Sequence, residues 1–68
     1  MSRHLAAQYS ADYEKMQELG NSHAQCVAYA EWQLFSALSA YAPAGSVHAM
    51  QQAATWLREV ARLGVKIG

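Results

Sequence analysis

Apolar and polar positions recur with a helical period along most of this chain, and most clearly from Ser22 to Ala42. An α-helix advances about 100° per residue, which places the bulky apolar residues of this segment on one arc. They are Val27, Leu34, Phe35, Leu38 and Tyr41. The arc spans roughly 200°, about twice the width that one core-facing side needs. The pattern therefore predicts a helix covered by more than one neighbour, and a second copy of this short chain is an obvious candidate.

The segment before it, residues 3 to 19, also has helical periodicity, and the junction between the two allows two interpretations. If the helix runs on through Gly20, the two apolar arcs nearly coincide, which favours one long helix over residues 3–42. Read locally, Gly20 is a C-terminal cap candidate, and Ser22 with Gln25 matches a capping box. The continuous or merely kinked helix is the preferred prediction, and a break at residues 20–22 is the alternative.

A firmer boundary follows at residues 42–46, where Pro43 disfavours helix in the preceding residue and Ser46 is a good N-cap. The short connection predicts an antiparallel hairpin with a last helix over residues 47–63. The residues expected on the inner side of that helix are Met50, Ala53, Ala54, Leu57, Val60, Ala61 and Leu63. The tail over residues 64–68 is expected to fray.

Composition narrows the fold to a single all-α domain over residues 1–68. The chain has 68 residues, and so small a domain usually needs oligomerisation, a metal or disulfides for stability. Its single cysteine excludes an intramolecular disulfide, so a homodimer forming a helical bundle is expected. The predicted dimer interface consists of Val27, Leu34, Leu38, Tyr41, Met50 and Leu57.

Charge and hydropathy exclude some partners and locations. The formal net charge is zero, which disfavours binding to nucleic acids or to anionic membranes by electrostatic attraction. No apolar run has the length of a signal peptide or of a transmembrane helix. The sequence therefore predicts a cytoplasmic protein that does not bind membranes.

Candidate chemistry is sparse. His4, His23 and His48 are too far apart in sequence for the spacing of a helical metal site. Cys26 has no neighbouring cation to activate its thiol and is interpreted as a small core residue. No paired carboxylates, nucleophile–base set or phosphate-binding loop is apparent, so we expect neither an enzyme nor a metal or other cofactor.

Residue types that dominate protein–protein hot spots point to a different class of function. The predicted partner-binding residues are Tyr29, Trp32, Phe35, Trp56, Arg58 and Arg62. The competing interpretation is that the aromatic residues simply pack in the core. The leading hypothesis is a small interaction protein that binds and modulates another protein, a size typical of accessory regulators encoded by mobile elements. The alternative is a dimeric transcriptional or RNA regulator that binds nucleic acid through Arg58, Arg62 and Lys66.

Hairpin geometry adds two contacts to the prediction. A turn centred near residues 44 and 45 pairs positions whose numbers sum to about 89. Trp32 should therefore lie beside Trp56. Glu31, which interrupts the apolar arc, should form an ion pair with Arg58.

Overall fold

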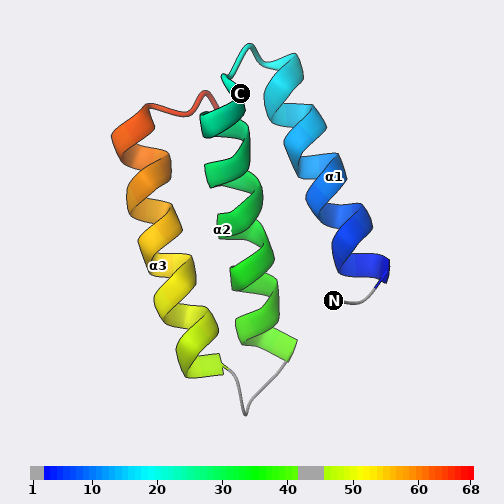
Figure 1. The fold of residues 1–68 in the computed structure, drawn as a ribbon, viewed down its shortest axis with the longest axis vertical. Coiled ribbons are helices and arrows are strands. Elements are labelled where there is room, and N and C mark those ends of the chain that lie inside the picture. The colour runs from blue at the N-terminus through cyan, green and yellow to red at the C-terminus, as the bar shows by residue number, and fades with distance from the viewer. Residues whose placement is uncertain (1–2, 42–45) are drawn as a thin grey trace.

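A computed structural model describes residues 3–41 and 46–68, and it shows three helices. They are α1 (Arg3–Glu18), α2 (His23–Tyr41) and α3 (Ser46–Leu63), so the predicted all-helical class is confirmed. The predicted connection at residues 42–45 lies outside the described residues. In Figure 1, α2 lies between α1 and α3, and neighbouring helices run in opposite directions.

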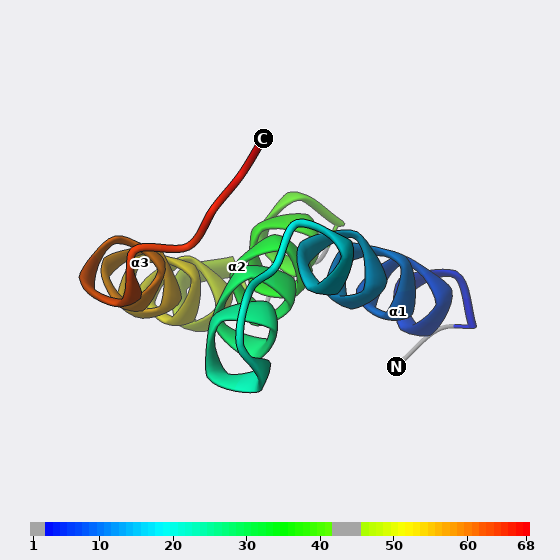
Figure 2. The ribbon, with the colours of Figure 1, turned by 90° about the horizontal axis from the view of Figure 1, so that it is seen from above.

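The three helices form a flat layer. Figure 2 shows α1 and α3 on opposite sides of α2, which packs against both of them. The molecule measures 36 × 25 × 16 Å, so its shortest dimension is less than half of its longest. The two broad sides of the layer leave much of the central helix uncovered.

The preferred prediction of one helix over residues 3–42 is wrong, and the alternative with a break is correct. Gly20 has a φ of 89°, a left-handed conformation that ends α1. The amide of Gly20 donates to the carbonyl of Gln17 at 3.0 Å, and that of Asn21 to the carbonyl of Met16 at 3.2 Å. This pair of bonds is a Schellman motif, which satisfies carbonyl groups that a helix end otherwise leaves unpaired.

The start of α2 is a capping box, as the local interpretation of Ser22 and Gln25 predicted. The Ser22 amide donates to Oε1 of Gln25 at 2.6 Å, and the Gln25 amide donates to Oγ of Ser22 at 3.2 Å. The helix stop at Gly20 and the helix start at Ser22 thus outweigh the agreement in phase between the apolar arcs on either side. Both arcs still supply the core, because Met16 of α1 and Cys26 of α2 are buried in it.

The core is small and asymmetric. Its buried hydrophobic residues are Met16, Cys26, Ala28, Tyr29, Ala30, Ala49 and Val60. Most of them lie where α1 meets the first half of α2 and where α3 ends. The bulky residues Leu34, Phe35 and Leu38, in the second half of α2, are only partly buried.

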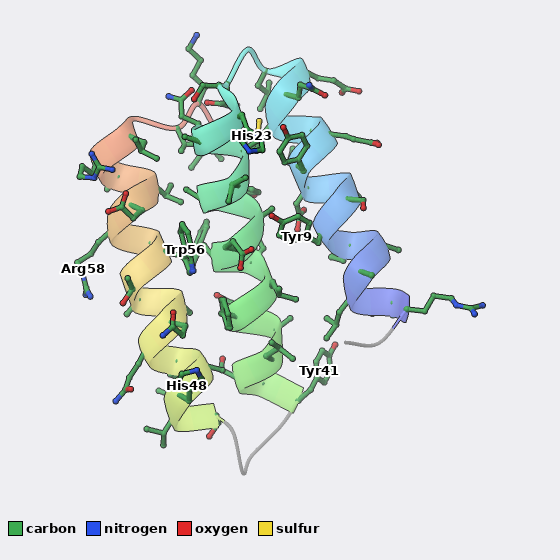
Figure 3. The ribbon with its side chains drawn as sticks, in the orientation of Figure 1. Tyr9, His23, Tyr41, His48, Trp56 and Arg58 are labelled. Carbon is green, nitrogen blue, oxygen red and sulfur yellow. The ribbon has the colours of Figure 1, made fainter. Side chains whose placement is uncertain are left out.

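The inner side of α3 differs from the predicted one. Ala49 and Val60 are buried, and Trp56 is partly buried against the core, whereas Met50 and Leu57 are 60% and 45% exposed. The apolar arc of α3 is wide, like that of α2, and only one half of it packs against α2. That half includes Trp56, the largest side chain of the helix, whose indole lies between α2 and α3 (Figure 3).

The tail does not fray at residues 64–66, contrary to the prediction. Gly64, with a φ of 64°, ends α3 in a second Schellman motif, and Val65 packs against the core. The side chain of Asn21 then holds the backbone of Lys66: its amide donates to the Lys66 carbonyl at 2.9 Å, and its oxygen accepts from the Lys66 amide at 2.8 Å. Gln25 donates to the Leu63 carbonyl at 2.8 Å. We call this set of bonds the polar clasp.

Candidate interaction surfaces

The histidines and the cysteine lie in ordinary structural surroundings. The ring of His23 shares a 2.8 Å hydrogen bond between its Nδ1 and the Tyr13 hydroxyl. Cys26 is 1% exposed, and burial raises the pKa of its thiol, which disfavours the reactive thiolate. Within residues 3–41 and 46–68, no group of three or more His, Cys, Asp or Glu residues is arranged to hold a metal ion.

Three of the predicted partner-binding aromatics pack in or against the core. Tyr29 is 6% exposed and meets Trp32 edge to face, with ring centroids 5.6 Å apart. Trp32 and Trp56 both pack against the core cluster, from α2 and α3 respectively. The competing interpretation, core packing, therefore describes these residues better. Phe35 remains partly exposed and stays a candidate for binding.

The predicted ion pair between Glu31 and Arg58 does not form. Arg58 is exposed, points away from the molecule in Figure 3 and donates to Oγ1 of Thr55 at 3.3 Å. Glu31 instead lies close enough to Tyr9 of α1 for its carboxylate to raise the pKa of the Tyr9 hydroxyl. The prediction failed because α3 is rotated relative to the expected phase, which turns Arg58 to the side opposite α2.

The predicted basic stripe is also interrupted. Lys66 lies beyond the end of α3, so it does not continue the helical row that Arg58 and Arg62 begin. Arg62 forms a salt bridge with Glu59, with 2.6 Å between Nη2 and Oε2. A hydrogen bond from Arg62 lowers the pKa of the Glu59 carboxyl. The three basic side chains therefore do not form one continuous helical row.

The first candidate surface lies on α2. Tyr13 of α1 bonds His23, and the end of α3 accepts a bond from Gln25, which identifies the two sides of α2 that are covered. Between these sides, helical geometry leaves two open arcs. One arc carries polar residues such as Gln33 and Ser36. The other, which we call the α2 face, consists of Val27, Glu31, Leu34, Phe35 and Leu38, all partly exposed, with Leu34 at its border with the side that α1 covers.

A carboxylate lies in the middle of the α2 face. Partial burial and then the nearby carboxylate of Glu31 raise the pKa of the Tyr9 hydroxyl. The Tyr9 phenol therefore stays neutral and brings no positive charge to Glu31, so the α2 face combines an apolar surround with one negative group.

The second candidate surface, which we call the α3 stripe, is more exposed. Val47, Met50 and Leu57 are 67%, 60% and 45% exposed, and Ala54 and Ala61 are exposed between and after them. These residues recur at alternating steps of three and four, the spacing of a helix-pairing seam. Because α2 and α3 run in opposite directions, right-handed helical geometry places the α3 stripe and the α2 face on opposite broad sides of the layer.

Met50 and Leu57 were predicted as interface residues, and Val47, Ala54 and Ala61 were not. The heptad spacing of these five residues is visible in the sequence, but their apolar arc adjoins that of the residues that pack against α2. Only the orientation of α3 shows which of the two groups is exposed.

No protein-family model matches this chain, no curated protein is similar to it in sequence, and no solved structure matches its fold. None of the described helices is both long enough and apolar enough to cross a membrane. What this protein does must therefore be inferred from its own surfaces.

Proposed function

We propose that this chain is a non-enzymatic interaction module that binds another protein and modulates its activity. The observation that carries this proposal is the α2 face. Every residue from 31 to 39 is partly exposed, although they belong to the central helix of the layer. A central helix normally supplies the most deeply buried residues, so apolar side chains left open there are available to a partner.

The total accessible surface area does not by itself indicate that a partner binds. The chain exposes 4427 Å², close to the roughly 4,200 Å² expected for a monomer of this mass. What distinguishes this surface is its composition. Leu34, Phe35 and Leu38 remain partly exposed while three alanines occupy the core.

The chemistry of the α2 face indicates the kind of target. An apolar surface around a carboxylate is complementary to a helix or strand that presents apolar side chains around one lysine or arginine. The target cation would meet Glu31 beside Phe35 and Leu38, in surroundings that exclude water. A charge-assisted hydrogen bond there contributes more than one at an exposed position.

Affinity capture with the full chain tests this proposal. Glu31→Gln keeps the shape of the side chain and removes its charge, so we expect about a tenfold loss of affinity for the captured protein, equivalent to roughly 1.4 kcal/mol. Glu14→Gln on the exposed side of α1 is the matched control and should bind as the wild type does. Circular dichroism of both variants should show unchanged helix content.

Two results would contradict the proposal. One is failure of the folded wild-type chain to retain any protein. The other is equal binding by Glu31→Gln and wild type, which would remove the α2 face as the binding surface.

A further inference from the structure

The α3 stripe has features that the proposed function does not use. It lies on the opposite side of the layer from the α2 face, and no charged side chain is among its five members. Its largest residues are about half to two-thirds exposed. An apolar seam with this spacing on a helix of Ser46–Leu63 is suited to pair with another helix.

We propose that the α3 stripe pairs with the same stripe of a second copy of this chain, with the two α3 helices antiparallel. Large and small residues alternate along the stripe. An antiparallel register therefore exists in which each layer pairs a large residue of one copy with a small residue of the other. Met50 meets Ala61 of the second copy, and Leu57 meets Ala54 of the second copy. Facing large and small residues interdigitate without leaving voids.

A parallel pair would fit less well. In that arrangement each residue meets its own equivalent, so Met50 and Leu57 would face each other in crowded layers. Ala54 and Ala61 would face their equivalents and leave gaps. Overpacked and underpacked layers are both destabilising. The order of residue sizes therefore selects the antiparallel arrangement.

The dimensions of the layer allow an interface of the size of a stable dimer. The broad side that carries the stripe measures 36 × 25 Å, so complete overlap of two copies sets a ceiling of about 1,800 Å² on the area buried in total. Stable interfaces bury about 1,200–2,000 Å².

Polar residues beside the stripe are compatible with this register. Gln51 and Arg58 flank the stripe on the same side, and antiparallel pairing brings each next to the other in the second copy. An amide oxygen can accept a hydrogen bond from a guanidinium, so no like charges are forced together at this position. The pairing leaves both α2 faces open on the outer sides, which would make the dimer bivalent for its target.

Sedimentation equilibrium of the full chain at micromolar concentration tests whether the pairing occurs. The wild type should sediment with twice its chain mass of 7.5 kDa, and Leu57→Glu should halve that mass with no loss of helix content. Leu57 is already 45% exposed, so the monomer tolerates the glutamate. Thr55→Glu, on an exposed position outside the stripe, should remain dimeric. A monomeric wild type, or a dimer that survives Leu57→Glu, would overturn the proposal.

Cysteine cross-linking tests the direction. When Met50→Cys and Ala61→Cys proteins are mixed and oxidised, the mixed disulfide should dominate. In the antiparallel register two copies of position 50 lie about 16 Å apart along the helices, too far for a disulfide. Dominant disulfides between two copies of Met50→Cys would instead show parallel helices and overturn the register. Cys26 is 1% exposed and does not compete in the folded protein. Because Glu31→Gln tests the other side of the layer, the two proposals can fail separately.

Discussion

The two ends of this three-helix layer differ in how many of their polar groups form hydrogen bonds and in how deeply their side chains are buried. At one end, which we call the clasp end, the turn between α1 and α2 lies against the tail that follows α3 (Figure 1). Two Schellman motifs, a capping box and the polar clasp satisfy the helix termini there. Asn21 is 8% exposed and uses both ends of its amide group. The clasp end is thus ordered by directional hydrogen bonds around buried side chains.

The opposite end, which we call the far end, contains the last turns of α2 and the first turns of α3. Ala49 is the one buried residue among the described positions there, while Tyr41 and Val47 are 73% and 67% exposed. Its bulky residues extend the two candidate surfaces instead of filling a core. This chain therefore stabilises its fold at one end and keeps apolar surface open toward the other.

The largest expected effect is from breaking the clasp. Asn21→Ala removes the two bonds to Lys66 and leaves backbone groups of a partly buried segment without partners. We expect a loss of about 2–4 kcal/mol in the free energy of unfolding, measured by urea denaturation. Gln8→Ala removes an exposed amide that donates to Asp12 and should change stability by less than about 0.5 kcal/mol. Equal effects of the two changes would show that the clasp does not stabilise this end.

A smaller effect is expected from the glycine that ends α1. Gly20→Ala places a side chain at a φ of 89°, and an added Cβ would meet Lys66 Nζ at 3.7 Å, an ordinary contact. The cost is therefore in the backbone, about 1–2 kcal/mol in unfolding free energy. Gly64→Ala, at a φ of 64° with nothing within 4 Å of the added Cβ, lies nearer the favourable left-handed region and should cost less. A larger loss of unfolding free energy for Gly64→Ala than for Gly20→Ala in urea denaturation would indicate that side-chain contacts, not backbone strain, determine the cost.

A pH titration tests the contact between α1 and α2 away from the clasp end. The pKa of Tyr9 lies above its ordinary value of 10.0 because burial, and then Glu31, disfavour the phenolate. The stabilisation from the neutral phenol is therefore present below pH 10 and is lost as the pH rises through the raised pKa. In Glu31→Gln the Tyr9 pKa should move toward 10.0, as followed by NMR with Tyr9→Phe as the assignment control. An unchanged titration in Glu31→Gln would mean that Tyr9 and Glu31 do not interact.

The smallest effect is expected at the surface salt bridge of α3. Arg62 and Glu59 are joined by short hydrogen bonds, but both groups are solvated and salt screens their attraction. Arg62→Ala should leave the midpoint of thermal unfolding unchanged, in contrast to Asn21→Ala. A clear loss of thermal stability would show that α3 depends on this pair more than its exposure suggests.

The sequence alone was enough to place the helical segments, and it contained the signals for their ends. Periodicity located all three segments, and local chemistry at Gly20, Ser22 and Gln25 indicated the correct break, although phase agreement made a continuous helix the preferred prediction. These signals act through bonds between residues only a few positions apart, which is why they can be read without a structure. The excess of apolar surface on α2 was also readable, because the width of an apolar arc depends only on helical geometry.

The tertiary structure decided which part of each wide arc is covered. The apolar arc of α3 offered two half-arcs of similar hydrophobicity, and packing of Trp56 against the core turned Arg58 outward and left Leu57 exposed. Asn21 and Lys66 are 45 residues apart, so no local pattern indicated that a side chain would hold the tail. Both outcomes depend on the geometry with which whole helices meet. That geometry is set by the packing of many side chains at once, and not by the preference of any one segment.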